Sequence, residues 1–447
     1  MAKRLLLYVI VLSILFVPGF YIRLGLPNIH PEDILILIAA AVLAFRPRQQ
    51  PMLTPQYAKG LTIPYLTFLL YVLAITLLMS PFIQGGSLLI TASVVSVVGM
   101  FKPLLLLLVI VALRLGPADT RKIGSLLVLA MTLELTIMYL QQYNHFGVNE
   151  WLTARYRPEE TSVIYLSGNR VFGTFGNPND LGTALSLIGT LAFARALFGP
   201  GKGMRVASGT IAAVTMVWLV WLAETRQGTA CMLGGCLMVL LLSMILGGKR
   251  SAGVVVGVGV FFGLIAGIAA IEATPALAGR FGLFTGQTTL GGEDSFMARV
   301  YHWPVVIKEL GGYILFGKGM LELVIVRTPE NGFLTAVILG GFPGLVLYVF
   351  MIFAPCVAAW RRLKANGLAH ADTWIHAAAW ASFVPLVLAN IPNTVINNSL
   401  VMSVYMIVYG LSFSLMLAQD REGAPQLPVE RIGVAAPAWR SRAVPAS

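Results

Sequence analysis

Long apolar segments separated by short polar ones dominate this chain. Several of them approach the roughly 20 residues that an α-helix needs to cross the hydrocarbon layer of a membrane. The pattern predicts an all-α, polytopic integral membrane protein with about twelve transmembrane helices. The predicted spans are residues 5–21, 34–45, 61–79, 94–115, 123–140, 181–197, 206–222, 229–246, 253–271, 333–360, 374–391 and 400–417.

Two of the apolar runs fit a single straight helix poorly. The run 87–115 is too long and holds Lys102 next to Pro103, so its first half is expected at the interface or as a re-entrant segment. The run 333–360 is interrupted by Gly340, Gly341, Pro343 and Gly344. Glycine and proline weaken a helix, so we expect a kink there, or a short helix before the full span.

Two stretches are too polar to cross a membrane and are predicted as long loops. They cover residues 141–180 and 272–332, and the second carries the most charged side chains of any loop in the chain. We therefore expect one membrane domain over residues 1–418. The remaining residues, 419–447, are rich in Ala, Pro and Arg and are expected to form a disordered cytoplasmic tail.

Composition agrees with this class. Hydrophobic residues make up 57% of the chain and charged residues 11%, against about 25% charged in soluble domains, and the mean hydropathy is +0.81. The net charge of +12 does not indicate nucleic acid, because the basic residues stand in short clusters between apolar runs. Such clusters mark cytoplasmic loops. A cytoplasmic N-terminus places most of the 31 Lys and Arg residues in short cytoplasmic segments, both termini inside and the two long loops outside.

The sequence predicts neither a cleaved signal peptide nor a set of cysteines that form disulfides or bind a metal. Lys3 and Arg4 precede an apolar run without a small-x-small cleavage site, which indicates a retained first helix. The three cysteines all lie in apolar segments and give no disulfide or metal framework.

Three arginines that are distant in sequence are predicted on the outer side of the membrane. Arg170 lies in the first long loop, Arg226 in a short turn, and Arg299 in the second long loop, while Glu330 precedes the tenth span. Guanidinium groups bind phosphate oxygens in a bidentate manner. A cationic cluster beside a carboxylate at an apolar surface therefore favours a phosphorylated, lipid-borne substrate.

Structural roles compete with this interpretation at each position. Arg226 has Glu224 as a local partner, and Arg299 is also explained by a side chain that extends from an interfacial helix to water. Asn179 or Asp180 is a candidate cap for the sixth span. Capping explains Glu330 and Asn331 about as well as catalysis does. His302, one turn after Arg299, is favoured as a hydrogen-bonded interfacial residue over a catalytic base. Lys102 and Glu134 are the ionisable residues deepest in the predicted spans, and such residues are often functional.

Several common catalytic motifs do not occur. The sequence has no Asp-x-Asp, His-Glu-x-x-His, Walker loop or Gly-x-Ser-x-Gly. It thus gives no support for metal-dependent sugar-nucleotide transfer, zinc hydrolysis, ATP-driven transport or serine hydrolase chemistry. A reaction here would use a substrate that is already activated.

The middle 200 residues carry four short motifs in a shared order and on a shared predicted side. These motifs are Arg170-Val-Phe-Gly-Thr-Phe-Gly-Asn177-Pro-Asn179, Thr225-Arg-Gln-Gly228, Arg299 to Trp303 leading to Phe316-Gly-Lys318-Gly, and Glu330-Asn331-Gly-Phe-Leu334. Together they resemble the O-antigen ligase and polymerase superfamily of bacterial inner-membrane proteins. The resemblance implies a GT-C-like helical architecture with a periplasmic active site. Ligases of that family typically have His-Asn where this chain has Glu330-Asn331, so the resemblance favours a polymerase.

The resemblance also implies roles for particular residues. Arg226, Arg299 and Glu330 are the expected catalytic residues, with both arginines on the diphosphate of an undecaprenyl-linked glycan and Glu330 as the base in an inverting transfer. The expected substrate-binding residues are Arg170, Asn177, His302, Lys318 and Asn331. No cofactor or metal is expected. The expected partners are the undecaprenyl-diphosphate-linked donor, a glycan or lipid-linked acceptor, the lipid bilayer and a chain-length regulator, but no nucleic acid.

Two other functions stay open from the sequence. A ligase that transfers finished glycan to lipid A core would differ only in its acceptor. A transporter or flippase of the same lipid would place its essential charges in mid-bilayer, at Lys102 and Glu134, rather than in the loops.

Overall fold

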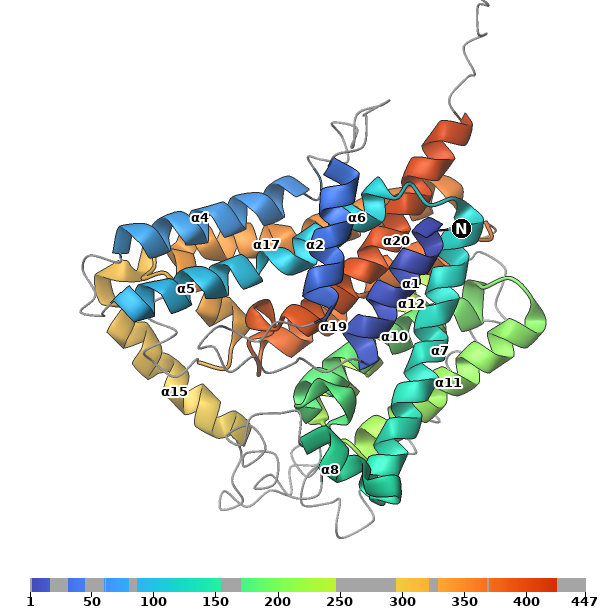
Figure 1. Cartoon of the computed structure of the whole chain (residues 1–447), viewed down its shortest axis with the longest axis horizontal. Helices are drawn as coiled ribbons and strands as arrows, with labels where there is room; N and C mark the ends of the chain where they lie inside the picture. Colours follow the sequence, from blue (N-terminus) through green and yellow to red (C-terminus); the bar gives the residue numbers. More distant parts are fainter. Residues whose placement is uncertain are drawn as a thin grey trace, which may run out of the picture.

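A computed structural model describes residues 2–16, 31–44, 60, 62–79, 87–153, 170–246, 295–320, 329–367 and 370–423. All regular secondary structure in these residues is helical (Figure 1). The principal helices are α1 (Ala2–Phe16), α2 (Pro31–Ala44), α4 (Ile63–Met79), α5 (Ser87–Gly99), α6 (Phe101–Ala112), α7 (Pro117–Gln142), α8 (Val148–Thr153), α10 (Pro178–Phe198), α11 (Lys202–Trp221), α12 (Arg226–Leu246), α15 (Ser295–Leu310), α17 (Gly332–Asn366), α18 (Thr373–Ala381), α19 (Phe383–Asn390) and α20 (Ser399–Gly423). Four 3₁₀ turns join them: η3 (His145–Gly147), η4 (Gly173–Phe175), η5 (Gly311–Ile314) and η6 (Val395–Asn397).

Within the described part of the chain, seven helical segments are long and apolar enough to cross a membrane. They are Ile90–Ala112, which joins α5 and α6, then α7, α10, α11, α12, α17, and residues Ser399–Asp420 of α20. The chain is therefore an all-α membrane protein. The count of twelve spans stays a prediction: α1, α2 and α4 are shorter apolar helices, and the predicted span 253–271 lies outside the described residues.

The core of the bundle is formed around α10 and α20, whose side chains are almost all buried. Helices α6, α7 and α18 pack on α20, and α11, α12 and α18 pack on α10. The contact of α10 with α12 is especially close, because Gly182 and Gly228 face each other. A β-carbon at Gly228 would lie 2.6 Å from the Cα of Gly182. Small residues that let backbones approach are a common means of helix association in membranes.

The two irregular runs noted in the sequence differ. A single turn residue, Met100, separates α5 from α6 and keeps helical backbone angles, so residues Ile90–Ala112 stay one helical segment, and the expected interfacial or re-entrant first half stays a prediction. The break in α17 falls at Gly340 and Gly341, whose backbone angles are not helical. Beyond it the chain folds back, since a β-carbon on Gly344 would lie 2.9 Å from the carbonyl oxygen of Ala336. The predicted kink is thereby confirmed.

The turn at residues 315–320, which contains Gly317 and Gly319, packs into the break in α17, and we call it the glycine turn. The backbone N–H of Lys318 donates to the carbonyl oxygen of Ile338, two residues before the break, at 2.7 Å. Gly317 has φ +79°, and a side chain there would lie 2.6 Å from the backbone nitrogens of Gly340 and Gly341. On the other side, the backbone N–H of Met320 donates to Thr76 of α4. The turn therefore holds the short first leg of α17, 332–339, in place against the break.

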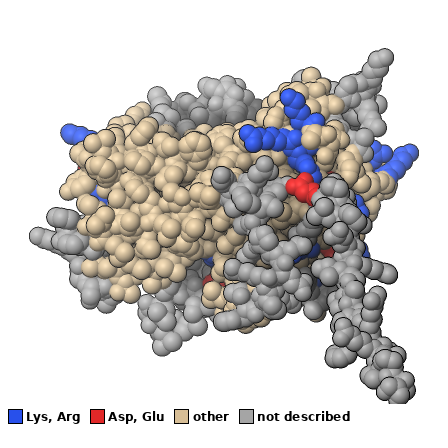
Figure 2. All heavy atoms as spheres, turned by 90° about the horizontal axis from the view of Figure 1, so that it is seen from above, with Lys and Arg blue, Asp and Glu red and all other residues tan. Residues whose placement is uncertain are grey.

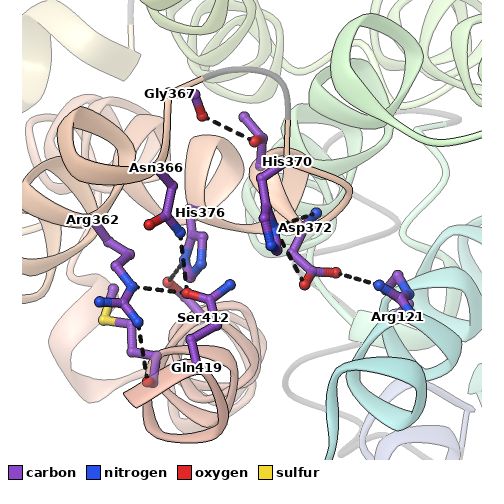
Figure 3. Close-up of polar contacts among 11 residues, drawn as sticks. Arg121, Arg362, Asn366, Gly367, His370, Asp372, His376, Ser412 and Gln419 are labelled. Carbon is purple, nitrogen blue, oxygen red and sulfur yellow. Dashed lines mark hydrogen bonds and ion pairs between the residues drawn. The ribbon is translucent and has the colours of Figure 1, made fainter. Parts of the chain in front are cut away.

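One end of the bundle is tied together by charged side chains. Arg4 pairs with Asp119, and Arg121 with Asp372 at 2.9 Å. Arg362 pairs with Asp420 at 2.8 Å and also donates to Gln419. Figure 3 shows Arg121 reaching Asp372 and Arg362 reaching Gln419. The starts of α1, α7 and α18 and the ends of α17 and α20 thus lie at the same end.

Basic side chains gather on this face, which Figure 2 views directly. The helix ends that meet here are those that the charge pattern assigns to a single side of the membrane. The last helix also runs further than expected, because α20 continues to Gly423. Helix α20 thus passes the predicted domain boundary at residue 418, and Arg362 and Asn366 bind the side chains of Asp420 and Gln419 there. Residues 424–447 of the expected tail lie outside the described residues.

Candidate functional site

Helices α10, α12 and α17 begin at the opposite end of the bundle, and each is capped by an Asn or Thr side chain. Asn177 accepts from the N–H of Asn179 at the start of α10 (2.8 Å), and Asn331 from that of Leu334 at the start of α17 (2.9 Å). Thr225 accepts from the N–H of Gly228 at the start of α12 (3.1 Å). The expectation that Asn179 or Asp180 caps α10 is wrong, because the sharp turn at Gly176 brings Asn177 into the cap position.

The side chain of Asn179 instead joins two of the predicted motifs. Its Oδ1 accepts from the hydroxyl of Thr225 (3.3 Å) and, at 3.5 Å, from the guanidinium of Arg170. The Nε of Arg170 also donates to the carbonyl oxygen of Ala223 (3.2 Å). Arg170 and the Thr225-Arg226 turn, which are separated by 55 positions along the chain, are therefore neighbours at the starts of α10 and α12.

Asp180 extends the same network to the loop between α19 and α20. Its carboxylate accepts from the amide of Asn393 at 3.1 Å. The next residue, Thr394, contacts the hydroxyl of Thr335 in α17. The amide of Asn331 donates to the carbonyl oxygen of Ile391 at the end of α19. We refer to Arg170, Asn177, Asn179, Asp180, Thr225, Asn331 and Asn393 as the cap cluster.

Two side chains of α7 hold the loop that carries Arg170. The Oε1 of Gln141 accepts from the N–H groups of Phe172 and Gly173 at 3.0 and 2.9 Å. The buried carboxylate of Glu134 accepts from both the N–H and the hydroxyl of Thr174. Gly173 has φ +54°, and a β-carbon there would meet the Oε1 of Glu134. Glu134, one of the two deep ionisable residues, thus anchors this loop to the bundle.

The other deep ionisable residue, Lys102, also has partners. Its ammonium group lies 2.8 Å from Glu32 and 2.7 Å from Asp33, at the start of α2. Buried charges in an apolar bundle are stable only when they are paired in this way. Lys102 therefore joins α6 to α2, and its contacts account for its position without a transport role.

Glu224 and Glu330 occupy equivalent places in this geometry. Each directly precedes a capping residue, Thr225 or Asn331, and each has a left-handed backbone, with φ of 46° and 48°. That conformation is uncommon for residues other than glycine and is concentrated at functional sites. Glu330 is half-buried, so its side chain is accessible from the start of α17.

The electrostatics at this end favour an anion. The first N–H groups of a helix carry a partial positive charge, and three such helix starts meet in the cap cluster. Arg170 adds a full charge inside the cluster, and Arg226, the first residue of α12, adds a second beside it. Helix starts of this kind are common binding sites for phosphate groups. Arg170 and Arg226 can therefore contact an anion that approaches from this end, beside the carboxylates of Asp180, Glu224 and Glu330.

Two further predicted residues lie on α15, which is fixed next to Glu330. The indole N–H of Trp303 donates to the carbonyl oxygen of Pro329 at 3.1 Å. His302, its neighbour, is exposed. Arg299 lies one turn earlier in α15, but its side chain lies outside the described residues. The helix that carries both residues is thus held against the residue that precedes Glu330.

Lys318 makes its described contacts at the break in α17. It stands in the glycine turn, two turns into α17 from Asn331, and its ammonium group lies 5.4 Å from the centroid of the Tyr313 ring. The described contacts of Lys318 join it to the break in α17 rather than to the cap cluster.

Sequence reasoning placed Thr225 in a motif without a role of its own, missed Asn393, and took Asn179 or Asp180 as the cap of α10. Asn393 lies in an Asn-rich loop, Asn390 to Asn398, and that composition was the available signal.

Among the described residues, no group of three or more His, Cys, Asp or Glu side chains is arranged to hold a metal ion. A scan against protein-family models finds no matching family. A search of curated proteins likewise finds no match.

Proposed function

We propose that this protein is an inner-membrane glycosyltransferase that extends an undecaprenyl-diphosphate-linked glycan on the periplasmic side, as polymerases of O-antigen, capsule or exopolysaccharide do. The observation that carries the proposal is the cap cluster. Residues from three motifs of the resemblance meet there, beside three helix starts in an apolar bundle. This is the chemistry needed to bind a diphosphate whose lipid chain stays in the bilayer.

In the proposed reaction, an acceptor hydroxyl oxygen attacks the anomeric carbon of the donor sugar. The bond between that carbon and the diphosphate oxygen breaks, and the lipid diphosphate leaves with the electron pair. Arg170, Arg226 and Arg299, together with the helix starts, stabilise the charge that develops on the leaving group. These groups would supply the charge stabilisation that a metal ion supplies elsewhere, so we propose a metal-independent transfer.

Glu330 is the proposed base. It accepts the proton of the attacking hydroxyl, a contribution of about 10²- to 10⁴-fold in rate. A single displacement inverts the configuration of the anomeric centre. Support for Glu330 comes from its half-buried position at the capped start of α17 and from its left-handed backbone, which the surrounding structure must maintain. His302, on the helix held beside Pro329, is the second candidate for this proton.

The partners of Lys102 and Glu134, the two ionisable residues deepest in the predicted spans, favour this enzyme over a transporter. A transporter would use intramembrane charges that alternate between environments. Here Lys102 is paired with two carboxylates, and Glu134 holds the loop of Arg170. Both have structural partners in the described structure.

The proposal is tested with purified protein and a lipid-diphosphate oligosaccharide, with the product read as a gel ladder. Arg226→Ala and Arg299→Ala should abolish chain growth, and Glu330→Gln should slow it by about 10²-fold or more while membrane insertion is retained. Arg205→Ala and Glu309→Gln are matched controls, because both residues are exposed and lie away from the cap cluster. A chelator should leave the ladder unchanged. Ladders of normal length in all three variants would remove the site assignment.

Cells that lack the protein separate the polymerase from the ligase. Loss of a polymerase leaves single repeat units on the lipid. Loss of a ligase leaves long polymer on the lipid.

A further inference from the structure

The turn between α7 and α8 presents a row of aromatic rings that the proposed chemistry does not use. Ring centroids are 4.9 Å apart for Tyr139 and Tyr143, 5.9 Å for Tyr143 and His145, and 6.4 Å for His145 and Phe146. Trp218 of α11 stacks on Tyr139 at 6.0 Å. We name these five residues the aromatic ledge. Phe146 is 93% exposed and Tyr143 56% exposed, so the row is open to a ligand.

The ledge is held in a fixed shape. Asn144 and Phe146 both have left-handed backbones, with φ of 49° and 59°. The side chain of Asn144 accepts from the N–H of Asn149 and donates to Glu150 at 3.0 Å. A bulky residue such as phenylalanine rarely adopts this conformation, and an exposed ring gains nothing from burial in the fold. The turn thus leaves the Phe146 ring exposed, although its backbone conformation is unfavourable for phenylalanine.

Charge indicates what the ledge binds. Residues 139–153 contain Glu150 and no Lys or Arg. Hydrogen bonds from its own backbone N–H and from Asn144 lower the pKa of Glu150, so this carboxylate stays ionised at neutral pH. A contact with anionic lipid headgroups would call for basic residues instead. Rings flanked by amides and a carboxylate suit a sugar, because rings stack on its C–H faces while amide and carboxylate groups bind its hydroxyls.

The ledge is joined to the cap cluster through Gln141. The amide of Asn149 donates to the carbonyl oxygen of Gln141, whose side chain accepts from Phe172 and Gly173 in the loop of Arg170. Leu152 of α8 packs directly on Phe172. In Figure 1, α8 lies beside the end of α7, at the end of the bundle opposite the chain terminus marked N. A glycan attached to a diphosphate in the cap cluster would therefore pass close to the ledge.

We propose that the aromatic ledge is a saccharide-binding surface that holds neutral or amino-bearing sugar units of the glycan. The proposal rests on the proposed function, which supplies a lipid-linked glycan at the neighbouring cluster. The proposal also narrows the class of glycan to neutral or amino-bearing sugars, because the ionised carboxylate of Glu150 disfavours sugars that carry carboxylates.

The test is a binding titration that needs no transferase activity. Purified full-length protein in nanodiscs of neutral lipid is titrated with lipid-free tetrasaccharides, one set neutral and one containing uronic acid, and binding is followed by saturation-transfer NMR. Phe146→Ala and Tyr143→Ala should each weaken neutral tetrasaccharide binding about fivefold to tenfold, and Phe146→Tyr should restore it. Phe342→Ala, which removes an exposed ring of α17, is the matched control.

Phe146→Leu separates a sugar from a lipid contact. Leucine keeps an apolar side chain but no ring, so binding should fall as it does in Phe146→Ala. Saturable binding that is unchanged in Phe146→Leu, equal binding of uronic-acid tetrasaccharides, or no saturable binding at all would overturn the proposal. Arg226→Ala should leave tetrasaccharide binding within about twofold, because lipid-free sugars carry no diphosphate. No chain growth by the unmodified protein would count against the transferase, and normal growth in Arg226→Ala would count against its site; neither outcome alters the ledge measurement.

Discussion

The amide of Asn393 donates a 3.1 Å hydrogen bond to the carboxylate of Asp180, across 213 positions of the chain. This contact joins the loop before α20 to the first turn of α10. Asp180 directly follows Asn179, which binds both Arg170 and Thr225. The position of the arginine loop is therefore linked to the loop that also contacts α17 through Thr394.

Asp180→Ala should destabilise the protein and reduce chain growth together. Removal of the carboxylate leaves the Asn393 amide without its acceptor, which costs about 1–3 kcal/mol. Asp180→Asn keeps an acceptor oxygen at the same place and should retain most of the stability. Thermal unfolding in detergent measures the first effect, and the gel ladder measures the second. Equal melting temperatures for the Ala and Asn variants would show that the contact is not important.

Gly173→Ala should disrupt the loop of Arg170. The new β-carbon would overlap the carboxylate of Glu134, in a left-handed residue that already disfavours side chains. Gly201→Ala is the matched control, since Gly201 also has a positive φ but no atom within 4 Å of the new carbon. Chain growth should be lost in the first variant and remain near normal in the second. Comparable activity in both would mean that Glu134 does not fix this loop.

Lys102→Met should be far more harmful than Glu32→Gln. The first change places two carboxylates, Glu32 and Asp33, side by side without the Lys102 charge. Loss of one partner from a buried ion pair costs about 3–5 kcal/mol. The second change still leaves Lys102 paired with Asp33 at 2.7 Å. The yield and melting temperature of each purified variant provide the comparison, and a stable Lys102→Met protein would contradict it.

The sequence predicted those features that depend on local pattern. The all-α membrane class follows from apolar runs, and the break in α17 follows from Gly340 and Gly341. The basic residues at helix ends predicted that the ends of α17 and α20 lie on the same side, because Lys and Arg collect in cytoplasmic segments.

Features that depend on partners distant in the chain were not predictable. Lys102 and Glu134 looked functional because their partners, Glu32 and Thr174, are 70 and 40 positions away. Capping by Asn177 depends on the backbone turn at Gly176, which composition alone does not reveal. The roles of Asn179 and Asn393 exist only after α10, α12 and α20 have packed.

The fold of α17 makes a last prediction, about how Glu330 is positioned. Gly341 has φ +62°, and a β-carbon there would lie 2.4 Å from the carbonyl oxygen of Leu315 in the glycine turn. Gly341→Ala should therefore separate the turn from α17 and move the short first leg of α17, whose N-terminal end carries Glu330 and Asn331. Chain growth should fall by at least tenfold while the protein still inserts and purifies, because the loss affects a junction rather than the core.

Gly367→Ala separates this displacement from backbone strain. Gly367, at the other end of α17, has φ +66° and no atom within 4 Å of an added carbon. Its substitution carries the same left-handed penalty, of order 1 kcal/mol, without a clash. If both variants lose chain growth equally, strain alone is responsible and the glycine turn does not position Glu330. If only Gly341→Ala loses it, the contact between Leu315 and Gly341 controls the geometry of the proposed base.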